Sequence, residues 1–112
     1  MTDEMRKEKL DYIKANVCKK ELLAQLAEEA TELAQAALKC RRTFDNTNPT
    51  PTSKAKALRN LIEEIDDVGL LLDSLTLKWR IVCGGAGRDK KLERWVKRLK
   101  AVKKGDVDNA GR

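Results

Sequence analysis

The sequence predicts an all-α fold, and three observations support this prediction. Apolar residues make up 41% of the 112 residues but aromatic residues only 4%, which favours leucine- and alanine-rich helices over a β-sandwich. Charged residues make up a further 38% and are spread among the apolar ones, as on amphipathic helices. Turn-forming residues gather in two short stretches, 45–53 and 83–87, which separate the longer helical segments.

Four helices are expected, over about residues 2–17, 19–44, 54–82 and 89–104. The second is rich in Leu and Ala, which are strong intrinsic helix formers. Thr52 or Ser53 is placed to cap the third. The fourth carries an apolar stripe of Leu92, Trp95, Val96 and Leu99. We therefore expect one all-α domain, a four-helix bundle over residues 1–104, followed by a flexible tail over 105–112.

The sequence contains no histidine, which excludes Ser-His-Asp and Cys-His nucleophiles and imidazole metal ligands. Its three cysteines, Cys18, Cys40 and Cys83, are far apart, so neither a disulfide framework nor a thiolate zinc site is indicated. Residues 1–9 are charged and lack the apolar core of a signal peptide. No stretch approaches the roughly 20 apolar residues of a membrane span. We expect a cytoplasmic protein with reduced cysteines and no membrane partner.

The net charge of +6 belongs to the C-terminal part of the chain. Residues 84–112 hold ten basic and four acidic side chains, whereas residues 1–83 hold fourteen of each. A basic segment of this kind favours nucleic-acid binding when composition alone is considered. Trp95 is its only aromatic residue and lies on the apolar stripe, so the segment offers no platform for base stacking, and nucleic acid is disfavoured as a partner.

Several carboxylates lie unusually close to apolar stripes. On a helical wheel at about 100° per residue, Glu29 falls within the leucine stripe of its helix and Glu32 falls at the edge of that stripe. Glu28 points further toward solvent. In the next helix Glu64 falls among apolar residues, and Asp67 borders the same side. Burying an unpaired carboxylate is unfavourable, so these side chains are expected to have a cation or another partner.

Two helices that pack antiparallel would bring these carboxylates together, because each helix offers two of them at i and i+3. Oxygen ligands without Cys or His favour Mg²⁺, with Mn²⁺ as the alternative, over zinc. An ordinary solvated acidic face is the other interpretation, and either pair taken alone favours it. Because both pairs point inward, the metal site and the solvated acidic face are about equally favoured as interpretations.

Residues 28–32, Glu-Glu-Ala-Thr-Glu, and 64–68, Glu-Ile-Asp-Asp-Val, resemble the E-E-x-x-E … E-x-x-D signature of the all-α nucleoside triphosphate pyrophosphatases, the MazG-like family. The similarity covers most of residues 20–80. It implies a MazG-like bundle completed by oligomerisation as a homodimer or homotetramer. It also implies hydrolysis of an NTP or dNTP to the monophosphate and pyrophosphate, with Mg²⁺ held by Glu29, Glu32, Glu64 and Asp67.

The resemblance also suggests roles for other residues. Glu28 or Glu29 would accept a proton from the attacking water. Family members have a basic segment of the pattern K-x-E-R-N-x-x-R, and residues 91–98 are similar except that Trp95 replaces Asn. The alternative for this segment is a solvated basic face with Trp95 in the core. The candidate substrate contacts are Gln25, Lys39, Asn60, Lys91, Arg94 and Arg98.

Two functions remain as alternatives to the enzyme. The first is a non-catalytic helical-bundle interaction module with an ordinary acidic face. The second, which is less favoured, is a nucleic-acid-binding protein that uses the basic C-terminal segment.

Overall fold

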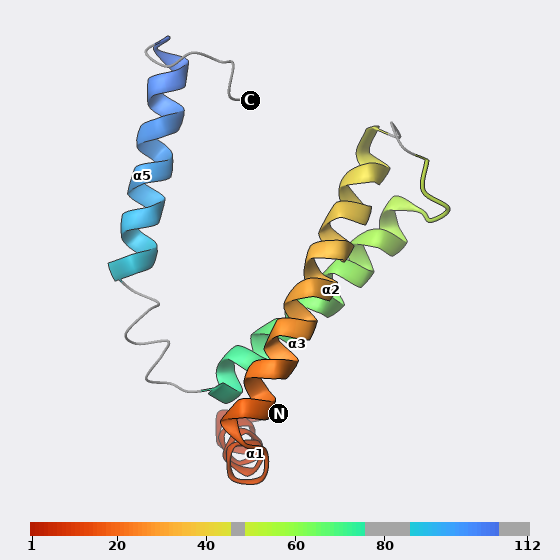
Figure 1. Cartoon of the computed structure of the whole chain (residues 1–112), viewed down its shortest axis with the longest axis vertical. Helices are drawn as coiled ribbons and strands as arrows, with labels where there is room; N and C mark the ends of the chain where they lie inside the picture. Colours follow the sequence, from red (N-terminus) through yellow and green to blue (C-terminus); the bar gives the residue numbers. More distant parts are fainter. Residues whose placement is uncertain (46–48, 76–85, 106–112) are drawn as a thin grey trace. The chain divides into compact units, whose positions relative to one another are not determined.

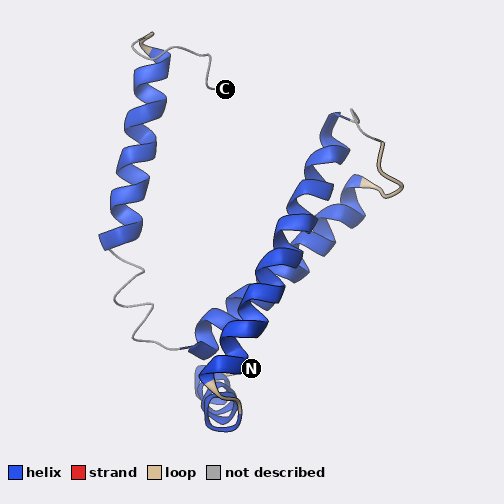
Figure 2. Cartoon of the chain, viewed as in Figure 1, coloured by secondary structure: helices blue, strands red, loops and turns tan. Residues whose placement is uncertain are grey.

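The computed structural model describes residues 1–45, 49–75 and 86–105. These residues are helical apart from short caps and turns, with no strand among them (Figures 1 and 2). The helices are α1 (Asp3–Asn16), α2 (Lys19–Asp45), α3 (Lys54–Leu75) and α5 (Ala86–Lys103). The predicted all-α class is confirmed, and the stretch of the expected third helix beyond Leu75 lies outside the described residues. The chain divides into two compact units, Met1–Thr76 and Leu77–Arg112.

The α1 helix begins and ends where its sequence favours a boundary. Thr2 is its N-cap, and the Thr2 Oγ1 accepts a hydrogen bond from the Met5 backbone N–H at 3.2 Å. Asp3 and Glu4 occupy the first turn, where the helix dipole favours negative charge. Val17 adopts an extended backbone and ends the helix, which leaves a short break before α2.

The first unit is built on a helical hairpin of α2 and α3, which lie side by side and run antiparallel (Figure 1). At the open end of the hairpin, Leu22 of α2 packs with Leu71 and Leu75 of α3. Ile13 and Val17 pack against the same cluster, so α1 covers this end. Toward the connecting loop, the buried residues are the smaller Cys40 and Ala57. The core is therefore bulky at one end of the hairpin and thin at the other.

The cap of α3 is Ser53, one of the two residues that the sequence offered for this role. Its Oγ accepts a hydrogen bond from the Lys56 backbone N–H at 3.1 Å. The neighbouring Thr52 Oγ1 is buried without a hydrogen-bond partner, so it does not act as the cap. The hydroxyl of Ser53 satisfies one of the amide groups that every helix start leaves unpaired.

Ser53→Ala is expected to lower the free energy of unfolding by about 1 kcal/mol, because it removes this cap. Chemical denaturation monitored by circular dichroism measures the change. Ser53→Asp should retain the stability, since a carboxylate oxygen also caps well. Thr52→Ala is the matched control and should leave the stability unchanged or slightly raised. Equal losses at both positions would contradict the assignment of the cap.

The second unit contributes α5, which begins at Ala86 rather than at the predicted Asp89. The prediction treated Ala86 and Gly87 as helix breakers, and this was wrong. Alanine is the best helix former, and a glycine in the first turn disturbs little because the amide groups there have no partner within the helix. Asp89 consequently lies in the first turn, where its charge is favourable. The helix ends before Gly105, whose positive φ of 77° suits a residue without a Cβ.

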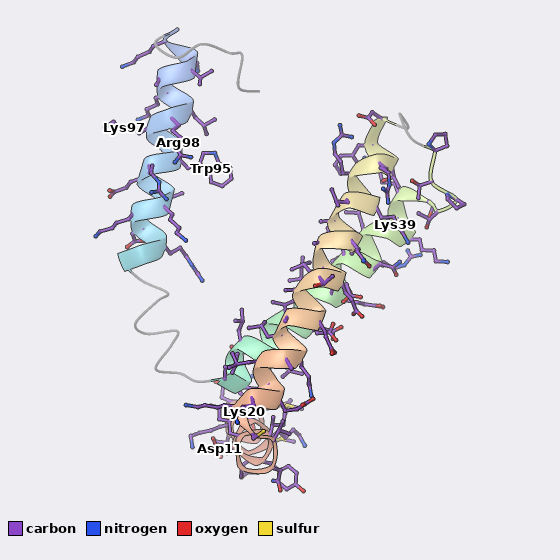
Figure 3. All side chains as sticks on the ribbon, viewed as in Figure 1. Asp11, Lys20, Lys39, Trp95, Lys97 and Arg98 are labelled. Atoms are coloured by element: carbon purple, nitrogen blue, oxygen red, sulfur yellow. The ribbon has the colours of Figure 1, made fainter. Side chains whose placement is uncertain are left out.

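The apolar stripe expected on α5 is exposed in the structure. Trp95 projects from the helix with 65% of its surface accessible (Figure 3). Leu92 and Leu99 are similarly exposed. None of the helices in the described ranges is long and apolar enough to cross a membrane. Cys18 and Cys40 are free thiols, exposed and buried respectively, and Cys83 lies outside the described residues.

Candidate metal centre

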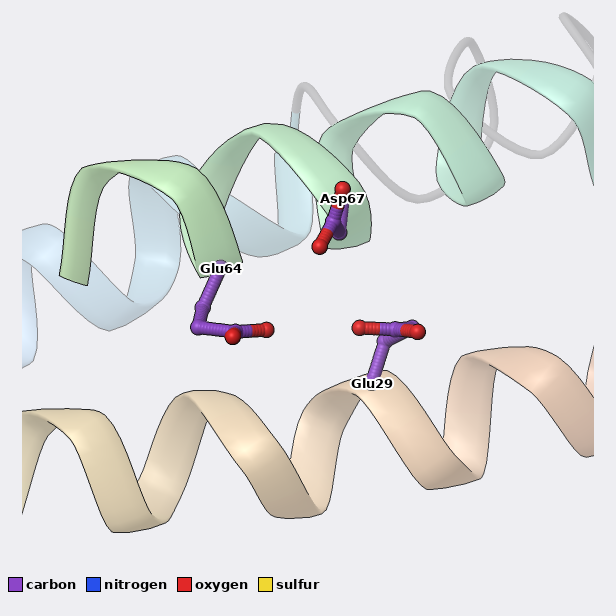
Figure 4. A group of neighbouring side chains, drawn as sticks. All are labelled: Glu29, Glu64 and Asp67. Carbon is purple, nitrogen blue, oxygen red and sulfur yellow. The ribbon is translucent and has the colours of Figure 1, made fainter. Parts of the chain in front are cut away.

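Three carboxylates meet between the two helices of the hairpin. Glu29 of α2 faces Glu64 and Asp67 of α3, and Figure 4 shows the three side chains converging on the space between the helices. One carboxylate oxygen from each residue lies within 4.8 Å of the other two. Three carboxylate oxygens gathered this closely could hold a metal ion.

The hairpin itself directs two of these carboxylates inward. Glu29 lies seven residues after the buried Leu22, and Glu64 lies seven residues after the buried Ala57. Seven residues are two helical turns, so each glutamate shares the face of its helix that packs against the other. Both therefore occupy positions where an apolar side chain would extend the core.

Burial leaves parts of both glutamates without a hydrogen-bond partner. The Oε2 atoms of Glu29 and Glu64 are buried and accept no hydrogen bond, whereas Asp67 is exposed. A carboxylate oxygen shielded from water and left without a donor is energetically unfavourable. A divalent cation removes this penalty, and oxygen donors without His or Cys match Mg²⁺ or Mn²⁺. The residues present thus fit the metal that the sequence suggested.

Glu29 and Glu64 also hold their protons more tightly than carboxyl groups usually do. Burial raises the pKa of Glu29 from 4.5 to about 7, reinforced by a hydrogen bond and the charge of Glu32 and by the charges of Asp67 and Glu64. Burial likewise raises the pKa of Glu64, followed by the charges of Glu32 and Asp67. Four acidic groups therefore act on one another in this part of the hairpin.

The four predicted metal ligands lie in one part of the hairpin, but only three of them form the close group. Glu29, Glu64 and Asp67 form the close group, while Glu32 is exposed and lies beside it, near enough to influence two of its members. Glu28, predicted as an alternative proton acceptor, is exposed and outside the close group.

A cleft of about 430 Å³ adjoins the carboxylates in the thin part of the hairpin. Its lining consists of Glu32, Gln35, Ala36, Lys39, Ala57, Asn60 and Glu64. Two of these residues are alanines, one from each helix, and their small side chains leave room for the cleft. Lys39 and Asn60, both predicted substrate contacts, are therefore placed beside the carboxylates.

The sequence interpretation did not include Gln35, although a signal was present. Gln35 follows Glu32 by three residues and precedes Lys39 by four, which is the spacing of one helix face. Extending that row along α2 would have identified it. Its amide adds a donor and an acceptor to the cleft.

The other predicted substrate contacts are not among the residues that line the cleft. Gln25 donates a hydrogen bond from Nε2 to the Glu21 Oε1 at 3.3 Å and does not line the cleft. Lys91, Arg94 and Arg98 are exposed on α5, which belongs to the second unit. A comparison of the chain with known protein families, curated proteins and solved structures finds no match.

Proposed function

We propose that the protein is a Mg²⁺-dependent nucleoside triphosphate pyrophosphohydrolase, as its resemblance to the MazG-like family implies. The reaction converts an NTP or dNTP and water into the monophosphate and pyrophosphate. One observation carries the proposal: Glu29, Glu64 and Asp67 converge within 4.8 Å, and two of them bury oxygen atoms that have no partner. Such an arrangement opposes folding unless a cation or a proton neutralises it.

Glu29, Glu64 and Asp67 would hold the metal, with Glu32 beside them as a further ligand. Once bound, Mg²⁺ or Mn²⁺ would supply neutralisation of phosphate charge and a lowered pKa for a bound water. Four carboxylates exceed the charge of one divalent ion, which suits more than one ion bound together with a polyphosphate. Of the two candidates for accepting the proton of water, Glu29 lies in the close group and Glu28 outside it, which supports Glu29.

The cleft provides groups suited to the rest of a nucleotide. The ammonium group of Lys39 is a compact positive charge that would stabilise phosphate oxygens as pyrophosphate leaves. The amides of Gln35 and Asn60 can donate and accept hydrogen bonds with a sugar or base. Lys91, Arg94 and Arg98 of α5 are proposed as further phosphate contacts. A cytoplasmic location with reduced cysteines is part of the same proposal.

Incubation of the purified protein with a panel of NTPs and dNTPs tests this function. With Mg²⁺ present, we expect release of pyrophosphate and a nucleoside monophosphate from at least one nucleotide, and chelation of the metal should abolish it. Separate measurement of orthophosphate distinguishes this reaction from loss of the terminal phosphate.

Two other results would support different functions. Absence of turnover for every nucleotide, together with a melting temperature that Mg²⁺ does not change, would favour the non-catalytic interaction module. Salt-dependent binding of nucleic acid that is lost when Lys97 and Arg98 are neutralised would favour the basic segment as the functional part.

A further inference from the structure

The positive charge of the chain is concentrated on a single helix, α5. This helix carries eight basic and two acidic side chains, an excess of six positive charges. Both acidic residues, Asp89 and Glu93, lie in its first half, so residues 94–103 carry five basic side chains and no acidic one. A charge density of this kind favours a partner whose surface is negatively charged.

The apolar residues of α5 lie along one side of the helix. On a helical wheel at about 100° per residue, four of them fall within a sector of about 100°. We call these four the α5 apolar stripe: Leu92, Trp95, Val96 and Leu99. All four are exposed, from 41% at Val96 to 65% at Trp95. Adjoining large apolar side chains that remain in contact with water mark an interaction surface.

Basic residues border the α5 apolar stripe on both sides. Lys91 and Arg98 follow one edge of the stripe, and Lys100 follows the other, with Lys91 and Lys100 each about 40° beyond it. Figure 3 shows Trp95 and Lys97 projecting from different sides of the helix. Long basic side chains beside an apolar strip can keep their charged ends in a polar layer while their stems lie along apolar surface.

We infer that α5 binds the surface of a membrane that contains anionic lipids. The helix lies parallel to the surface, with the α5 apolar stripe among the upper parts of the acyl chains and the bordering basic side chains among the lipid phosphates. An apolar strip with basic borders is the pattern of helices that bind in this way. Trp95 suits the boundary, because an indole has a large apolar body and one polar N–H group.

This inference differs from the expectation of no membrane partner, which rests on the lack of a signal peptide and of a spanning segment. A helix that lies along the surface needs neither. It keeps its charged side in water, so it does not require about 20 consecutive apolar residues. The charge and the apolar stripe act together, since anionic lipids attract the helix and the stripe then leaves water.

Nucleic acid is the other negatively charged surface that α5 could bind. It would satisfy the basic side chains, but contact with phosphates alone would leave the α5 apolar stripe in water. Trp95 is the only aromatic residue of the helix, so successive bases would find no row of rings to stack on. A lipid surface accommodates the charge and the stripe at once, and we therefore favour it.

Co-sedimentation of the full chain with lipid vesicles tests the inference. We expect binding to vesicles of phosphatidylcholine and phosphatidylserine in equal amounts, and binding at least about tenfold weaker to phosphatidylcholine alone, because several basic side chains each gain from the anionic lipid. Added salt should weaken the binding. The vesicles contain no protein, so binding to them shows that lipid is sufficient.

Two leucines of equal exposure provide a matched pair of variants. Leu99 on α5 is 60% exposed and Leu38 on α2 is 61% exposed. Leu99→Gln should weaken binding to the mixed vesicles by about tenfold, because it removes an apolar side chain from the buried stripe. Leu38→Gln should leave binding unchanged. Both sites are exposed, so folding should be retained, and circular dichroism verifies this.

The fluorescence of Trp95 reports insertion directly. The chain has two tryptophans, Trp79 and Trp95, so Trp79→Phe leaves Trp95 as the only one. We expect its emission to shift to shorter wavelength when mixed vesicles are added, because the indole leaves water. Acrylamide should then quench the emission less effectively.

Several results would overturn the inference. Absence of binding to the mixed vesicles would do so, as would equal binding to both kinds of vesicle or equal effects of Leu99→Gln and Leu38→Gln. Binding without a shift in Trp95 emission would reject insertion, and emission that is already shifted without vesicles would show that protein covers the stripe. Displacement of the vesicles by duplex DNA at equal phosphate concentration would favour nucleic acid. Binding is measured without nucleotide, so its failure is independent of the proposed activity.

Discussion

Glu64→Gln is expected to reduce pyrophosphate release by about 100-fold or more, the effect of removing a group that helps to neutralise developing charge. The substitution keeps the size of the side chain but removes one carboxylate from the close group. The amide is a weaker ligand for Mg²⁺ than a carboxylate, so fewer active complexes form. Initial rates at saturating nucleotide, measured over a range of Mg²⁺ concentrations, separate weaker metal binding from slower turnover.

The neighbouring residue offers a matched control. Glu63 is exposed, lies on the same helix and is outside the close group, so Glu63→Gln should keep the wild-type rate within about twofold. Glu28→Gln distinguishes the two proposed proton acceptors, and the geometry predicts a small effect. Equal losses for Glu63→Gln and Glu64→Gln would indicate a general effect of charge rather than a site.

The helices could be predicted from the sequence because their boundaries are set locally. The stretch 45–53 breaks any helix through its two prolines and its turn residues, and α2 and α3 end and begin on either side of it. The start of α5 could not be placed as well, because Ala86 and Gly87 have opposite helix propensities and the balance depends on the whole segment.

The inward direction of the carboxylates could also be predicted, since a helical wheel fixes the face on which Glu29 and Glu64 lie. Their mutual distance could not. It depends on the register between α2 and α3, which the packing of Leu22 against α3 determines. The cleft has the same origin, because residues of both helices, Ala36 and Ala57 among them, line it together. The residue pattern of a single helix does not show which of its residues lie opposite which residues of a second helix.

Metal-free protein is expected to lose stability as the pH rises toward about 7. The pKa of Glu29 is about 7 in the folded protein and 4.5 as its ordinary value, so between these values the folded chain binds more protons than the unfolded chain. The contribution of this proton is fully present below pH 4.5 and is lost as the pH passes through about 7. Glu64, whose pKa is also raised, acts in the same direction. Melting temperatures in the presence of a chelator, between about pH 5 and pH 8, measure the change.

The composition makes this experiment unusually clean, because a protein without histidine has few other groups that titrate in that window. Glu29→Gln should flatten the decline and raise the melting temperature of the metal-free protein above pH 7, since it removes a charge from a crowded group. If the carboxylates bind Mg²⁺ as proposed, they bind it in their ionised form, so Mg²⁺ should stabilise the wild type more at pH 8 than at pH 5 and have little effect on Glu29→Gln. The exposed Glu28→Gln should behave like the wild type in both tests. If Mg²⁺ stabilised Glu29→Gln as strongly as the wild type, the binding site of the metal would lie elsewhere. If the metal-free Glu29→Gln variant is more stable than the metal-free wild type and does not respond to Mg²⁺, Glu29 is kept for a ligand rather than for the fold.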